Sequence, residues 1–151
     1  VANKHVQKER SADPKRKPLR LQHYDYSTAG YYFITICTMR KGKLFGDIVK
    51  EKMHLSSAGN MLEYWWHELW KKYSTVSTDA FVVMPNHFHG IIILQDVGAE
   101  LCVRPPVEST GRSHRSAPTL GDIVKWYKTM TTNAYIKGVR NNGWKPSKGC
   151  G

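Results

Sequence analysis

Three stretches of the chain combine apolar, aromatic and β-branched residues in the pattern of β-strands. Residues 31–38 follow a glycine and are rich in Tyr, Phe, Ile and Thr. Residues 79–84 and 88–94 are apolar runs on either side of Pro85 and Asn86. Such runs, bounded by turn residues, predict strands, and the short turn makes the last two antiparallel neighbours. Residues 44–55 are also predicted to be extended, and a hairpin with residues 31–38 is one arrangement they allow.

Two other segments have apolar residues at three- and four-residue spacing, which indicates amphipathic helices. Ser56 and Ser57 precede the first, which is predicted over about residues 58–73. Thr119 precedes the second, which is predicted to run to about residue 137. Hydroxyl side chains at these positions are typical N-caps.

Tryptophans on the first predicted helix have two interpretations. They would suit a platform on which nucleic-acid bases stack, or they belong to the hydrophobic core. They share their stripe with leucines, so we favour core positions for Trp65, Trp66 and Trp70.

The predicted order is strand, helix, strand, strand, helix, which is most of a ferredoxin-like βαββαβ unit without its closing strand. The fold class is therefore α+β, an antiparallel sheet with two helices on one face. The 151 residues suit one domain. We expect a flexible basic arm over residues 1–18, a domain over 19–145 that contains a long loop at 95–118, and a tail over 146–151.

The charge balance favours a polyanionic partner. Lys and Arg number 23 against 12 Asp and Glu, a net charge of +11. Nucleic acid is the commonest partner of so basic a chain, although a generally basic, solvated surface would have the same composition. No apolar run approaches the roughly 20 residues that span a bilayer, so we expect no membrane segment. Three scattered cysteines argue against a disulfide framework and indicate the cytoplasm.

The most informative residues are two histidines that follow the predicted turn. His87 and His89 are two positions apart, so on a strand both imidazoles point to one face and Phe88 points to the other. Two imidazoles about 7 Å apart at their Cβ atoms can chelate one metal ion. Two such histidines can equally be exposed and idle, and a metal site needs a third ligand from elsewhere. Imidazole also suits zinc better than magnesium.

Beyond these residues, the sequence resembles the HUH single-tyrosine transposases, most closely the REP-associated tyrosine transposase family. HUH denotes His, a bulky hydrophobic residue and His, here His87, Phe88 and His89. The resemblance extends over about residues 16–145. Its motifs are Arg20-Leu21, Tyr24-Asp25-Tyr26, residues 32–38, Leu44-Phe45-Gly46, residues 79–92 and residues 119–124.

The resemblance implies a ferredoxin-like protein that acts on single-stranded or hairpin DNA, often as a homodimer. It implies that His87 and His89 hold a divalent ion, Mg²⁺ or Mn²⁺, which polarises the scissile phosphate. A tyrosine then attacks, forms a 5′-phosphotyrosine link and releases a 3′-hydroxyl, so that the strand can later be rejoined. The basic residues expected to contact DNA are Arg16, Lys17, Arg20, Arg112, Arg115, Lys125 and Lys128.

We expect one part of the family pattern to lack a counterpart here. The family's nucleophilic tyrosine lies on a C-terminal helix beyond the closing strand, and we expect both elements to be missing here. The tyrosines after the HUH motif are Tyr127 and Tyr135, both on the second predicted helix, and Tyr127 shares its apolar stripe. Three interpretations stay open: a truncated transposase that does not cleave alone, a non-catalytic DNA- or RNA-binding module, and a nuclease that recruits Tyr127 or Tyr135.

Overall fold

The computed structural model describes residues 21–39, 42–96 and 118–146. The expected basic arm, most of the 95–118 loop and the tail from residue 147 lie outside these residues. The elements, in chain order, are β1 (Gly30–Cys37), β2 (Gly46–Val49), β3 (Lys52–Leu55), α1 (Ser57–His67), α2 (Leu69–Lys72), β4 (Val76–Met84), β5 (His87–Leu94) and α3 (Leu120–Asn141).

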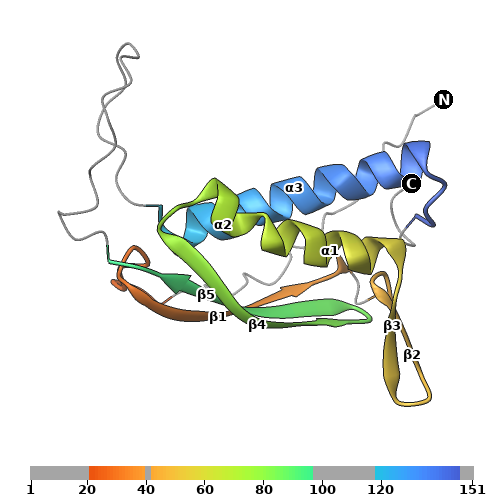
Figure 1. Cartoon of the computed structure of the whole chain (residues 1–151), viewed down its shortest axis with the longest axis horizontal. Coiled ribbons are helices and arrows are strands. Elements are labelled where there is room, and N and C mark those ends of the chain that lie inside the picture. The colour runs from red at the N-terminus through yellow and green to blue at the C-terminus, as the bar shows by residue number, and fades with distance from the viewer. Residues whose placement is uncertain (1–20, 40–41, 97–117, 147–151) are drawn as a thin grey trace, which may run out of the picture.

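The main sheet is antiparallel and has the strand order β1-β5-β4. The helices lie on one face of it, as Figure 1 shows. The predicted α+β class, with an antiparallel sheet and helices on one face, is therefore confirmed. Within the described residues no fourth strand pairs with the outer edge of β1.

The segment 44–55 does not pair with β1. It folds on itself as the β2–β3 hairpin, which projects from one end of the main sheet (Figure 1). Its two-residue turn, Lys50 and Glu51, has positive φ at both positions, 49° and 64°. Positive φ at both positions matches the twist of a two-residue hairpin turn, where Asn and Gly are the usual residues. Because Lys and Glu stand there instead, the sequence did not predict this turn. Meanwhile β5 occupies the inner edge of β1 along its whole length.

Both helix starts were predicted correctly from local chemistry. The Ser56 hydroxyl accepts a hydrogen bond from the Gly59 amide at 3.1 Å and begins α1. Thr119 and Asp122 form a reciprocal capping box that begins α3. The first predicted helix is interrupted at Glu68, which divides α1 from α2, and α3 continues four residues beyond the predicted 137.

The core lies between the sheet and the helices. Its fully buried large side chains come from α1, α2, β5 and α3: Trp66, Leu69, Phe88, Ile92, Ile123 and Tyr127. Trp66 is therefore a core residue and Trp65 packs against the core, as predicted. The prediction is wrong for Trp70, which lies on α2 and is 56% exposed. Among the described residues, no helix is both long and apolar enough to cross a membrane.

Candidate functional site

The face of the sheet opposite the helices holds the two histidines of the HUH motif. Strand β5 alternates regularly: Phe88 is fully buried, whereas His87 and His89 are half-buried on the other side. Their ring centroids are 4.7 Å apart. The predicted strand pair and the shared face of the two imidazoles are thus confirmed, because a strand alternates the direction of its side chains.

Each imidazole is held through its Nδ1 atom. His87 Nδ1 lies 2.7 Å from the side-chain oxygen of Asn86, and His89 Nδ1 lies 2.8 Å from the hydroxyl of Thr35 on β1. The Asn86 oxygen carries no proton, so the His87 ring donates from Nδ1, and in the neutral ring Nε2 then keeps its lone pair. Metal-binding histidines are commonly oriented in this way.

The turn that presents His87 is fixed by contacts from two other segments. The Asn86 carbonyl accepts hydrogen bonds from the amide and the hydroxyl of Thr38, at 2.9 and 3.0 Å. The Pro85 carbonyl accepts from the amides of Leu44 and Phe45, at 2.9 and 3.0 Å. Hydrogen bonds from the end of β1 and from the base of the β2–β3 hairpin therefore fix the position of the turn next to the histidines.

The donor chemistry of this pair suits a divalent ion in part. The two rings meet edge to face, with centroids 4.7 Å apart and planes at 77°, which is an ordinary ring contact and is also close enough for one ion with metal–nitrogen bonds of about 2.1 Å to reach both. The described residues contain no cluster of three or more His, Cys, Asp or Glu side chains suited to a metal. His87 and His89 are thus two imidazoles that this part of the chain brings together without a third side chain of these types.

Tyr127 belongs to the opposite side of the sheet. It is 1% exposed, its ring contacts Phe88 with centroids 5.7 Å apart, and its hydroxyl donates to the Leu62 carbonyl at 3.0 Å. Burial raises the pKa of this hydroxyl far above its usual value. Since Phe88 points away from the histidines, Tyr127 is a core residue, as its apolar stripe predicted, and does not face them.

Tyr135 also lies on α3, two helical turns beyond Tyr127. Its hydroxyl donates to the Lys145 carbonyl at 3.0 Å, and its ring packs near Trp144 with centroids 6.3 Å apart. The tyrosine is half-buried by these contacts. Its contacts join the end of α3 to the segment that follows it, which is a structural role.

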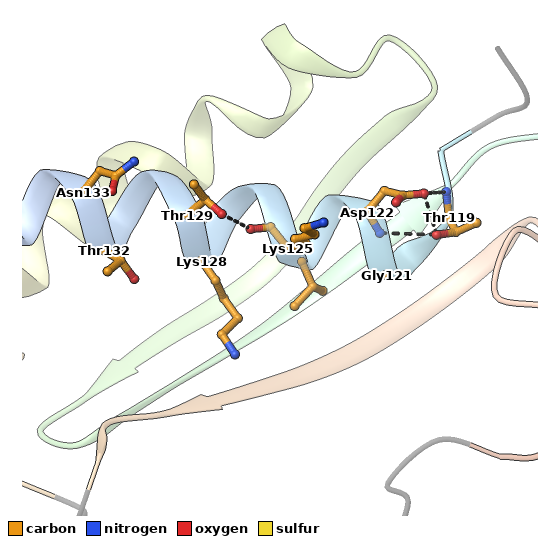
Figure 2. Close-up of a pocket in the computed structure, with 9 residues that line it drawn as sticks. Thr119, Gly121, Asp122, Lys125, Lys128, Thr129, Thr132 and Asn133 are labelled. Atoms are coloured by element: carbon orange, nitrogen blue, oxygen red, sulfur yellow. Dashed lines mark hydrogen bonds between the residues drawn. The ribbon is translucent and has the colours of Figure 1, made fainter.

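Two of the predicted DNA-contacting cations lie on α3. Lys125 and Lys128 are exposed and line a pocket along the polar side of the helix with Thr129, Thr132 and Asn133. In Figure 2 the side chain of Lys128 extends away from the helix. The other predicted cations, Arg16, Lys17, Arg20, Arg112 and Arg115, lie outside the described residues.

Sequence reasoning missed two residues that contact the histidines. Thr35 bonds His89, and Phe33, two positions earlier on β1, stacks on the same ring with centroids 5.2 Å apart and planes at 21°. The alternation of β1 places both on one face, but only the register, Thr35 opposite His89, shows which residue they meet.

Comparison with known proteins places the chain beside one bacterial protein. An uncharacterized protein of Haemophilus influenzae is 37% identical over 120 residues, which is 78% of this chain and 67% of that protein. The chain belongs to the same family as this protein. No family model matches the sequence. No solved structure matches it significantly.

Proposed function

We propose that this protein acts on single-stranded or hairpin DNA as an HUH-type, transposase-like protein. The supporting observation is the pair His87 and His89, whose rings lie 4.7 Å apart on the sheet face away from the helices and are both anchored through Nδ1. The resemblance to the REP-associated tyrosine transposases gives this pair its role. The net charge of +11 suits a DNA partner.

In this proposal the two imidazoles hold Mg²⁺ or Mn²⁺ through Nε2. The ion would act as a Lewis acid that polarises a phosphodiester. Asn86 keeps the His87 ring in the tautomer that leaves Nε2 unprotonated, and Thr35 holds the orientation of the His89 ring. Lys125 and Lys128 contribute positive charge for the phosphate backbone. We further propose a cytoplasmic location, where the exposed thiol of Cys37 stays reduced.

A second function, a nucleic-acid-binding module without chemistry, is favoured by the position of Tyr127. This tyrosine is enclosed in the core and bonded to Leu62, so it is not available as a nucleophile. In that case the exposed cations would bind the strand and the histidines would not take part in catalysis.

Metal titration tests the proposed site. We expect Mn²⁺ to bind weakly, because the described residues add no third His, Cys, Asp or Glu ligand to the two imidazoles. The double variant His87→Ala/His89→Ala should lose binding. His54→Ala is the matched control, since His54 is an exposed histidine on the β2–β3 hairpin. Equal Mn²⁺ binding by the wild type and the double variant, measured by calorimetry, would refute the site.

A cleavage assay separates the two functions. The protein is incubated with Mn²⁺ and a labelled single-stranded hairpin, and a denaturing gel shows cut strands or a protein–DNA adduct. Products that disappear in His87→Ala/His89→Ala support the HUH-type protein. Retained DNA binding without products fits both the binding module and a truncated transposase that does not cleave alone. Mn²⁺ binding that is lost in the double variant then favours the truncated transposase, and no Mn²⁺ binding favours the binding module.

A further inference from the structure

Strand β1 presents two large aromatic rings on the sheet face that the helices leave uncovered. Tyr31 is 73% exposed and Phe33 is 68% exposed, whereas their neighbours Tyr32 and Ile34 point into the core at 9% each. On the same face Val82 of β4 is 46% exposed. Clustered apolar side chains at this exposure usually mark a binding surface.

Phe33 adjoins the histidine pair directly. Its ring stacks on the His89 ring, with centroids 5.2 Å apart and planes at 21°. The register places Phe33 opposite Ile91 and Thr35 opposite His89, so Phe33 is the diagonal cross-strand neighbour of His89. Because Phe33 is still 68% exposed, much of its ring remains open to a planar ligand.

We propose that Phe33, with Tyr31 next to it on the same face, is a stacking platform for unpaired DNA bases. This inference rests on the proposed function and extends it by naming the residues that hold the strand beside the histidines. Residues two apart on a strand are about 7 Å from each other, which leaves room for one base on each ring. Exposed aromatics on an open sheet bind single strands in this way in other folds.

The composition of this face favours a single strand over other occupants. A protein partner or a second copy would have to bury the imidazoles of His87 and His89 and the Thr35 hydroxyl, at a cost in desolvation. A single strand can leave these polar groups near its phosphates and stack its bases on the rings. Bases in a duplex already stack on each other, so the platform selects unpaired DNA.

Binding of a labelled 12-nucleotide oligo-dT in EDTA tests the platform without any contribution from a metal. We expect Phe33→Leu to weaken binding about 5- to 100-fold, because it removes a stacked ring and keeps apolar bulk. Phe33→Tyr should bind within about twofold of the wild type, since it keeps the ring. Trp70→Leu, a change to an exposed aromatic on α2, is the matched control and should bind normally.

An oligonucleotide of the same length with abasic sites provides the second arm. The wild type should bind it at least as weakly as Phe33→Leu binds oligo-dT, because Tyr31 also loses its stacked base, and Phe33→Leu should bind it no worse than the wild type does. Thermal unfolding checks that the variants remain folded.

Two outcomes overturn the inference: wild-type affinity of Phe33→Leu for oligo-dT, or a change of oligomeric state in that variant, which would assign the ring to a second copy. If Phe33→Leu binds normally while His87→Ala/His89→Ala loses Mn²⁺, this inference fails and the proposed function stands. If oligo-dT binding depends on Phe33 but Mn²⁺ does not bind, the platform stands and the metal function fails.

Discussion

Gly90 lies directly against the indole ring of Trp66. A Cβ atom built on Gly90 would come within 2.5 Å of the Trp66 ring, closer than a carbon–carbon contact allows. Gly90 follows His89 on β5, so the close approach seats the histidine-bearing strand on the buried tryptophan of α1. Glycine at position 90 therefore provides the space that this contact needs.

Gly90→Ala should therefore destabilise the fold. The added methyl group forces Trp66 or β5 to shift, and overpacking of this kind costs about 1–3 kcal/mol in free energy of unfolding. Urea denaturation measures the change. Gly42→Ala is the matched control, because a Cβ there meets nothing closer than 4.0 Å. Equal stability of Gly90→Ala and the wild type would contradict the contact.

Asn86→Ala should weaken the binding of Mn²⁺ by about 10- to 100-fold, the usual effect of losing a group that orients a ligand. The change removes the acceptor for His87 Nδ1, while the backbone bonds of residue 86 to Thr38 remain. Calorimetry measures the affinity. Asn133→Ala, on the exposed side of α3, is the control. An unchanged dissociation constant for Asn86→Ala would show that the bond does not orient the ring toward a metal.

Tyr127→Phe should change how stability depends on alkaline pH. Burial raises the pKa of Tyr127, so the folded state favours the protonated hydroxyl. This stabilisation is complete below the unfolded-state pKa near 10 and is lost as the pH rises toward the folded-state value, by roughly 1 kcal/mol per pH unit. Phenylalanine cannot ionise, so the decline in free energy of unfolding above pH 10 should be shallower.

The same variant loses the hydrogen bond to the Leu62 carbonyl and should be about 1 kcal/mol less stable at pH 8. Urea denaturation at pH 8 and at pH 11 measures both effects. Tyr64→Phe, at a tyrosine that is 57% exposed, serves as the control. If Tyr127→Phe declines with pH as steeply as the wild type, the buried hydroxyl is not the source of the alkaline sensitivity.

Lys125→Gln with Lys128→Gln should reduce the salt dependence of DNA binding. Each cation that neutralises a phosphate contributes about 0.7 to the slope of log affinity against log salt for single strands, so the slope should fall by roughly 1.4. Fluorescence anisotropy over a range of salt concentrations measures it. Lys71→Gln is the control, because Lys71 is paired with Glu68 at 2.6 Å. An unchanged slope would show that Lys125 and Lys128 on α3 do not neutralise DNA phosphates.

The sequence by itself determined those features that depend on near neighbours in the chain. The shared face of His87 and His89 follows from the two-residue period of a strand, and Phe88 enters the core for the same reason. The helix starts at Ser56 and Thr119 follow from side chains that bond amides three residues ahead. These relations span a few residues, so local pattern is enough to predict them.

Only the tertiary structure decided which distant residues meet. The register of β1 on β5 brings Thr35 and Phe33 to His89, 54 and 56 positions away, and no local pattern specifies that register. The pairing of β2 with β3 depends on a turn formed by Lys50 and Glu51, and these residue types do not predict a hairpin turn. Each strand could pair with several others along the chain. Which strands pair, and in which register, depends on how their side chains pack against the helices.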